Sequence, residues 1–266
     1  MEHAEPSWDT ASFPAHRKGQ TMKMTMRNVC GALLGLSLVA CGPAVEGEES
    51  VQELEQELEA GCTQLGSTIT GHACTHANNS ADLVAVTATS GLTSSTPDIS
   101  TAHKFYSVTL PAGATGTVKY RPSLAGSWAL YLTKNITVTV KDASGNTVAS
   151  ALGHAVSATG CSLVKAVVFD LTSTTTDYRV DLGSATGDQV AMVLERLEDN
   201  RVRYYQDADG DAWGNSSVSK YTACVPPSGY ITQRFDCNDA NASIHPGATE
   251  TLGNSVDENC NGSLTN

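Results

Sequence analysis

The last sixty residues carry carboxylates, amides, glycines and cysteines at short fixed spacings, and this pattern limits what the segment can fold into. Asp207, Asp209 and Asp211 alternate around Gly210. Carboxylates this close together repel one another unless a cation lies between them. Ca²⁺, which takes about six to eight oxygen ligands, is the usual cation for such a set. The segment has too few apolar residues for a core of its own, so we expect metal ligands and disulfides to stabilise it.

The first acidic loop matches an EF-hand only in part. Its three aspartates occupy loop positions one, three and five, and the Trp213 carbonyl suits position seven. However, Ala212 replaces the glycine at position six, and Val218 replaces the closing glutamate. No flanking helices are predicted. We therefore exclude an EF-hand and expect the remaining ligands to come from elsewhere in the tail.

With the first loop, three further segments complete this pattern, which runs through residues 204–211 (YYQDADGD), 236–239 (DCND), 244–250 (IHPGATE) and 257–262 (DENCNG). In this order they resemble the MopE-type metal-binding motif, which recurs in surface and secreted proteins of myxobacteria and related proteobacteria. The similarity covers roughly residues 203–263. In such tails the acidic loops are understood as calcium sites. The resemblance thus implies a set of Ca²⁺ ligands consisting of Asp207, Asp209, Asp211, Trp213, Asp236, Asn238, Asp239, Asn241, Glu250, Asp257, Asn259 and Asn261.

The tail departs from this family at three positions. Ala212 stands where the family favours glycine, so we expect a strained backbone angle that costs about 1 kcal/mol. Asn238 replaces a frequent aspartate, which keeps an oxygen but loses a charge. Leu252 stands where the family usually has a cysteine, which leaves Cys260 without its expected local partner.

The cysteines predict disulfides. Apart from Cys30 in the leader and Cys41, which is the expected lipid attachment site, the chain has six cysteines: Cys62, Cys74, Cys161, Cys224, Cys237 and Cys260. An even number in an oxidising compartment is typical of disulfide-bonded proteins, and the absence of a CxxC pair argues against a thiolate zinc site. We expect Cys224 to pair with Cys237, and Cys260 to pair with a cysteine of the preceding domain. Fifteen connectivities are nevertheless open to six cysteines.

The N-terminus predicts export and a lipid anchor. Lys23 and Arg27 precede an apolar run at residues 29–40, which is too short to span a membrane. The run ends at Cys41 in a sequence that resembles a bacterial lipobox, whose cysteine is acylated. The alternative is an ordinary signal peptide with a chance cysteine. We expect residues 1–40 to be a leader with its true start at Met22–Met26, and the glutamate-rich residues 41–61 to be an acidic tether.

Residues 62–200 predict an antiparallel β-sandwich or jelly roll, because short alternating strands are separated by turn residues. No segment shows convincing helical periodicity. A loop-rich metal-binding module follows at residues 201–266. The predicted strands are residues 83–89, 105–110, 116–120, 128–132, 136–140, 164–171, 178–182 and 189–194.

Three histidines suggest a second metal site. His72 and His76 have the i, i+4 spacing of a zinc-protease helix, but Ala73 replaces the catalytic glutamate. With His103 as a third ligand, they would suit copper or zinc. The alternative is that Cys74 is disulfide-bonded and that the histidines are polar surface residues.

The net charge and the absence of known catalytic motifs argue against several classes of function. The net charge of −12 argues against a nucleic-acid partner. The chain has no nucleophile elbow, zinc-protease, phosphate-loop or dinucleotide motif. We expect a non-catalytic protein of the cell envelope, anchored to a membrane through Cys41, which binds a surface ligand, adheres or acts as a scaffold. The alternatives are a copper-binding surface protein and a secreted hydrolase or its accessory module.

Overall fold

The computed structural model describes residues 62–183 and 189–265. The predicted leader, the lipid attachment at Cys41 and the acidic tether lie outside these residues. No helix among the described residues is long and apolar enough to cross a membrane. The elements in chain order are α1 (Ser67–Asn78), η1 (Ser80–Asp82), β1 (Leu83–Thr87), β2 (Phe105–Thr109), β3 (Gly116–Tyr120), β4 (Gly126–Leu132), β5 (Val138–Lys141), β6 (Thr147–Val148), β7 (Ser150–Ala155), β8 (Lys165–Leu171), β9 (Tyr178–Leu182), β10 (Gln189–Arg196), η2 (Glu198–Asn200), β11 (Val202–Gln206), β12 (Asn215–Thr222) and β13 (Tyr230–Ile231).

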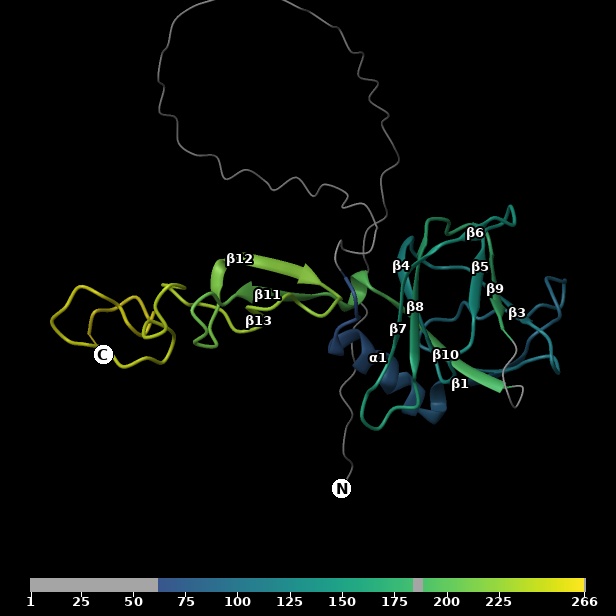
Figure 1. Ribbon diagram of the computed structural model, residues 1–266, viewed down its shortest axis with the longest axis horizontal. Helices are drawn as coiled ribbons and strands as arrows, with labels where there is room; N and C mark the ends of the chain where they lie inside the picture. Colours follow the sequence, from purple (N-terminus) through teal and green to yellow (C-terminus); the bar gives the residue numbers. More distant parts are fainter. Residues whose placement is uncertain (1–61, 184–188, 266) are drawn as a thin grey trace, which may run out of the picture. The chain divides into compact units, whose positions relative to one another are not determined.

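Strands β1–β10 form two sheets (Figure 1). One has six strands in the order β1-β2-β10-β4-β8-β7, and the other has four in the order β3-β9-β5-β6. The predicted mainly β, antiparallel fold is confirmed, with β1 and β2 as a parallel exception. All eight predicted strands are present, whereas β6 and β7 were not predicted.

The main core lies between the two sheets. Alternate residues of the six-stranded sheet, such as Val108 and Met192, pack with residues of the other sheet, such as Val118 and Leu182, and all four side chains are 0% exposed. Successive side chains of a strand point to opposite faces of its sheet, so every second residue reaches the face that packs against the other sheet. The sandwich is therefore held by aliphatic and aromatic side chains of both sheets.

Helix α1 covers the opposite face of the six-stranded sheet, and the sequence analysis was wrong to find no helix. Ile69 and Ala73 are 0% exposed and pack in one cluster with Tyr131 of β4 and Val193 of β10. The helix contains Gly71 and three threonines, all poor helix formers. Its stability comes from packing on the sheet, and local propensity therefore gave too weak a signal.

The disulfides correct the predicted pairing. The six cysteines among the described residues are all bonded, as expected, but the pairs are Cys62–Cys224, Cys74–Cys161 and Cys237–Cys260. The predicted Cys224–Cys237 bond is wrong, and Cys260 pairs within the tail. A covalent link between the tail and the preceding domain does exist, but it is made by Cys224. The backbone explains this choice, because Gly66 N–H donates to the Ala223 carbonyl at 2.8 Å and holds the two segments together.

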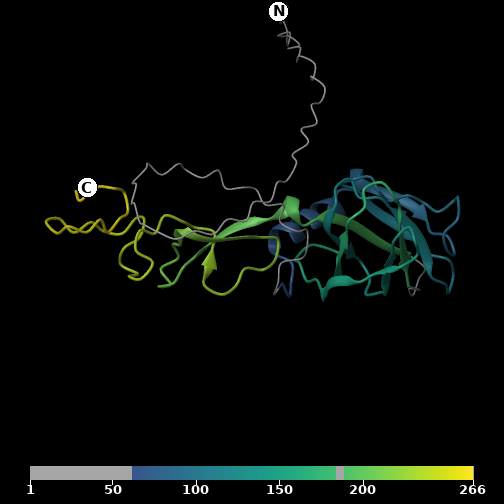
Figure 2. The ribbon, with the colours of Figure 1, turned by 90° about the horizontal axis from the view of Figure 1, so that it is seen from above.

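The C-terminal segment is stabilised by few strands. Its sheet has three strands in the order β12-β11-β13. Beyond Ile231 the described chain consists of turns and irregular coil apart from an isolated bridge at Asp236, and it is coloured yellow in Figure 2. This coil is held by side-chain contacts, by the Cys237–Cys260 disulfide and by a few backbone hydrogen bonds, such as that from the N–H of His245 to the Glu258 carbonyl at 2.9 Å.

We expect Ile69→Ala to lower the free energy of unfolding by about 2–5 kcal/mol, because it leaves a cavity between α1 and the sheet. The exposed Thr68 of the same helix gives a matched control, since Thr68→Ala is expected to change stability by less than about 0.5 kcal/mol. Urea denaturation of the purified protein measures both. Equal effects would contradict the packing of α1 on the sheet.

Candidate metal centre

The hairpin of β11 and β12 presents the first acidic loop. Residues 207–214 connect the two antiparallel strands. Oδ1 of Asp207 accepts the N–H of Gly210 at 2.8 Å, and its Oδ2 accepts the N–H of Ala212 at 3.2 Å. The loop backbone thus wraps around the Asp207 carboxylate. Together with the next two alternate aspartates, this residue forms a group whose carboxylate oxygens lie within 4.8 Å of one another.

Two further aspartates join this loop from the segment after β13. The N–H of Asp236 donates to the Gly214 carbonyl at 3.2 Å, and Oδ1 of Asp239 accepts the N–H of Ala208 at 2.7 Å. Asp209, Asp236 and Asp239 form a second group of carboxylates within 4.8 Å. Because Asp209 belongs to both groups, the structure brings five predicted ligands together around one residue.

Several of these oxygens are buried without a hydrogen-bond partner. They are Oδ2 of Asp209, Oδ2 of Asp211 and Oδ2 of Asp236. The ion pairs found in residues 62–183 and 189–265 include none of the five aspartates. Burial raises the pKa of Asp236, and the nearby charges of Asp211 and Asp209 raise it further. Buried carboxylates without partners are strongly unfavourable, so these atoms fit a bound cation.

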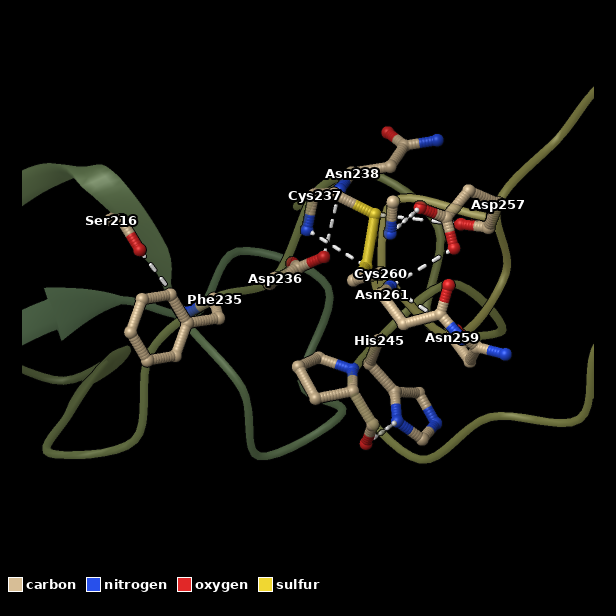
Figure 3. The surroundings of a disulfide bond; sticks show 12 residues. Ser216, Phe235, Asp236, Cys237, Asn238, His245, Asp257, Asn259, Cys260 and Asn261 are labelled. Carbon is tan, nitrogen blue, oxygen red and sulfur yellow. Dashed lines mark hydrogen bonds between the residues drawn. A yellow bond between two sulfur atoms is a disulfide. The ribbon is translucent and has the colours of Figure 1, made fainter. Parts of the chain in front are cut away.

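The loop at residues 257–262 repeats the hydrogen bonding of the loop at residues 207–212 (Figure 3). Oδ2 of Asp257 accepts the N–H of Gly262 at 2.7 Å, five positions along, as the first aspartate of the earlier loop does. In each loop the third residue also accepts the N–H of the fifth, at 3.1 Å from Asn259 and at 3.3 Å from Asp209. The two loops therefore share one local design.

Backbone angles confirm this likeness. The fourth residues, Gly210 and Cys260, have φ of 83° and 54°. The sixth residues, Ala212 and Gly262, have φ of 75° and 83°. The strain predicted at Ala212 is thus confirmed, since a side chain with Cβ stands where the second loop has glycine.

Glu250 supplies a further unpartnered carboxylate in the tail. It is 6% exposed, and neither of its side-chain oxygens has a hydrogen-bond partner. The adjacent N–H of Thr251 donates to Oε2 of Glu258 at 3.0 Å, which brings this segment to the start of the second loop. Cys260, the fourth residue of the second loop, forms the disulfide with Cys237 that is drawn in Figure 3. Glu250 is in none of the groups of side chains found close enough to hold an ion among the described residues, so its role as a metal ligand stays a prediction.

The remaining predicted ligands have mainly local contacts. Asn238 donates its N–H to Asp236 at 2.8 Å, and Asn241 accepts the N–H of Ser243 at 3.3 Å. Oδ1 of Asn261 accepts the N–H of Ser263 at 2.7 Å. Trp213 donates its N–H to Asp211 at 2.7 Å. A role for these residues in metal binding stays a prediction.

The three histidines also lie together. His72, His76 and His103 each offer a ring nitrogen, and these atoms lie within 4.8 Å of one another. Cys74 forms a disulfide, as the alternative interpretation expected. The sequence analysis missed Asp82 and Glu195, whose carboxylates each contact one of the histidines at 2.8 Å. Glu195 carried a signal that was overlooked, because it is a charged residue that directly follows the apolar residues 190–194 of β10.

Comparisons with known proteins support the metal-binding tail. Residues 236–264 match the Cu-binding MopE family, whose description is "Putative metal-binding motif". The match includes Asp236, Glu250 and the second loop, whereas the hairpin loop at residues 207–214 precedes it. A search of curated proteins found no match. The C-terminal segment is therefore similar, over residues 236–264, to a family described by this metal-binding motif.

We expect Ala212→Gly to raise the free energy of unfolding by about 0.5–1 kcal/mol, because glycine adopts a positive φ without steric cost. Ala208→Gly is the control in the same loop, since Ala208 is not among the residues with positive φ. This second variant is expected to gain nothing. Chemical denaturation in calcium-containing buffer measures the difference, and an equal effect of the two changes would contradict strain at Ala212.

Proposed function

We propose that residues 201–266 are a calcium-stabilised module of a non-catalytic, lipid-anchored protein of the cell envelope. The observation that carries the proposal is the set of buried, unpartnered Oδ2 atoms of Asp209, Asp211 and Asp236, which belong to two groups of three aspartates that share Asp209. Divalent cations bound within these two groups would supply partners for these atoms.

The chemistry of the donors favours calcium. All side-chain donors in the two groups are carboxylate oxygens, which are the ligands that Ca²⁺ prefers. Copper prefers imidazole and thiolate ligands, so the copper in the family's name does not fit these donors. Mg²⁺ requires near-ideal octahedral geometry and usually retains several waters. A crowded group of five carboxylates suits the larger and more adaptable ion.

Calcium in this module has a structural role. Beyond residue 200 the buried apolar residues are Tyr205, Ala223, Cys224 and Ile244. Such a small apolar set gives little stabilisation, so the free energy of metal binding becomes free energy of folding. The five-aspartate group also joins two stretches of chain, since three aspartates lie in the hairpin loop and two follow β13. Calcium would thus hold the coil against the hairpin.

The proposed location and role follow from the sequence. The lipobox-like sequence at Cys41 supports a lipid anchor, and the acidic tether would separate the folded part from the membrane. The β-sandwich would then face outward and bind a surface ligand, mediate adhesion or act as a scaffold. The disulfides support an oxidising compartment outside the cytoplasm.

We expect removal of calcium with a chelator to destabilise the tail. At free calcium of about 100 times Kd, binding contributes about 2.7 kcal/mol, so the melting temperature of the C-terminal segment should fall clearly. Trypsin cleavage after the exposed Arg234 should accelerate at the same time, because this residue lies near the start of the irregular coil. Calorimetry and timed proteolysis provide the two measurements.

Asp209→Asn tests the site directly, because Asp209 belongs to both carboxylate groups. We expect it to weaken calcium binding at least about 10-fold, in keeping with the dependence of affinity on ligand charge. Asp98→Asn is the control, since its oxygen accepts only the N–H of Ser100 and lies outside both groups. Identical melting with and without chelator would refute the calcium proposal.

The lipid anchor makes a separate prediction. In a bacterial host with lipoprotein processing, the wild-type protein is expected to incorporate an alkyne-labelled fatty acid and to fractionate with membranes. Cys41→Ser should abolish both properties, whereas Cys30→Ser should leave them intact, because Cys30 lies within the apolar run. Labelling that persists in the Cys41 variant would contradict the assignment.

A further inference from the structure

Three imidazoles from two separate elements converge at one end of helix α1. His72 and His76 lie one turn apart on the helix, and His103 lies in the loop before β2. The ring centroids are 4.8 Å apart for His72 and His76, 5.5 Å for His72 and His103, and 5.0 Å for His76 and His103. His103 has a φ of 57°, a strained backbone conformation of the kind that clusters at functional sites.

Each helix imidazole is held by a carboxylate on the same ring atom. Nδ1 of His72 lies 2.8 Å from Oε2 of Glu195, and Nδ1 of His76 lies 2.8 Å from Oδ2 of Asp82. A carboxylate only accepts, so a neutral imidazole in this position carries its proton on Nδ1 and leaves the lone pair of Nε2 free. Metal-binding histidines almost always have such a partner, which fixes the ring and its tautomer.

The third imidazole is placed to share an ion with the second. Nδ1 of His103 lies 3.1 Å from Nε2 of His76. Two nitrogens that bind one ion at about 2.05 Å are separated by about 2.9 Å in square-planar and about 3.3 Å in tetrahedral geometry. Without an ion these atoms form one N–H···N hydrogen bond, and with an ion both lone pairs can point to the metal.

The supporting groups are themselves fixed. Oδ2 of Asp82 also accepts from Nδ2 of Asn79 at 3.0 Å, and Lys104 contacts its Oδ1 at 3.5 Å. Cys74, which lies between the two helix histidines, is bonded to Cys161. The site is therefore preorganised by hydrogen bonds and by a disulfide, which lowers the entropy cost of binding an ion.

The buried carboxylate of Glu195 gives an electrostatic reason to expect a cation at this site. Glu195 is 4% exposed. Its Oε2 contacts His72, and its Oε1 is buried without a hydrogen-bond partner. A buried carboxylate with one neutral partner is poorly compensated. A divalent ion on the far side of the His72 ring would polarise the imidazole and strengthen its hydrogen bond to Glu195.

We propose that His72, His76 and His103 bind one divalent late transition-metal ion of the Cu²⁺ or Zn²⁺ type. The ligands are Nε2 of the two helix residues and Nδ1 of His103, and the carboxylates of Glu195 and Asp82 position the first two. Three protein ligands leave at least one coordination position for water or an external ligand. This site is separate from the calcium module, because its donors are nitrogens and lie on other elements.

Equilibrium dialysis of tag-free, calcium-loaded protein against Cu²⁺ or Zn²⁺ tests the proposal. We expect one equivalent of one of these ions to bind, with nitrogen hyperfine structure in the electron paramagnetic resonance spectrum of the copper form. His76→Gln and His103→Gln should each weaken binding more than about 10-fold. His154→Gln is the matched control, since His154 lies outside the cluster.

Two carboxylate variants separate this site from a fortuitous pair of surface histidines. Asp82→Asn and Glu195→Gln should each reduce affinity by about 10–100-fold without a change in stoichiometry, because they act through the ligand rings. Asp98→Asn should leave binding of Cu²⁺ or Zn²⁺ unchanged, because Asp98 lies outside the histidine cluster and both carboxylate groups. Circular dichroism of the metal-free variants checks folding, and the loop variant His103→Gln keeps the test valid if a helix variant unfolds. Binding that is absent in the wild type, or equal in wild type and His103→Gln, would overturn the proposal.

Discussion

The centre of the six-stranded sheet is buried on both faces, and the positions of helix α1 and of the four-stranded sheet depend on this. All seven residues of β4 are buried, because one face of this strand packs against the four-stranded sheet and the other against α1. Covering the second face requires the helix, and the helix carries two of the three clustered histidines. The same face of β10 carries Val193, which packs under the helix, and Glu195, which contacts His72. Hydrophobic burial therefore places the polar groups of the histidine cluster.

The C-terminal segment is stabilised in a different way from the β-sandwich. It has few buried apolar side chains and instead gathers carboxylates whose mutual repulsion opposes folding. Backbone N–H groups offset part of this repulsion, as in the turn around Asp207. The Oδ2 atoms without partners mark the part that the polypeptide leaves uncompensated. One chain thus contains a fold that is stable through its own core and a segment that depends on disulfides and, as we propose, on ions.

The sequence predicted the features that depend on local pattern. Alternating apolar residues located all eight expected strands, and the preference of glycine for positive φ located the strain at Ala212. Features that depend on tertiary contact were missed. Helix α1 has weak local propensity and forms on the sheet, and β6 and β7 are too short or too exposed to give a clear alternation. The pairing of Cys62 with Cys224 depends on a backbone contact across a long stretch of chain, which spacing alone does not encode. For the metal centre, the sequence named the five aspartates but not the sharing of Asp209 between the two groups.

The two similar loops of the tail share one backbone geometry but differ in the number of carboxylates that they offer. Both wrap an initial aspartate with the same turns, yet the first offers three carboxylates at alternate positions and the second offers Asp257 with Asn259 and Asn261. Since fewer charges mean weaker attraction for a divalent ion, equal shape would come with unequal affinity. Such a pair of loops would fill in sequence as calcium rises and empty in the reverse order as it falls. The rigidity of the segment would then vary in steps with the calcium content of the surroundings.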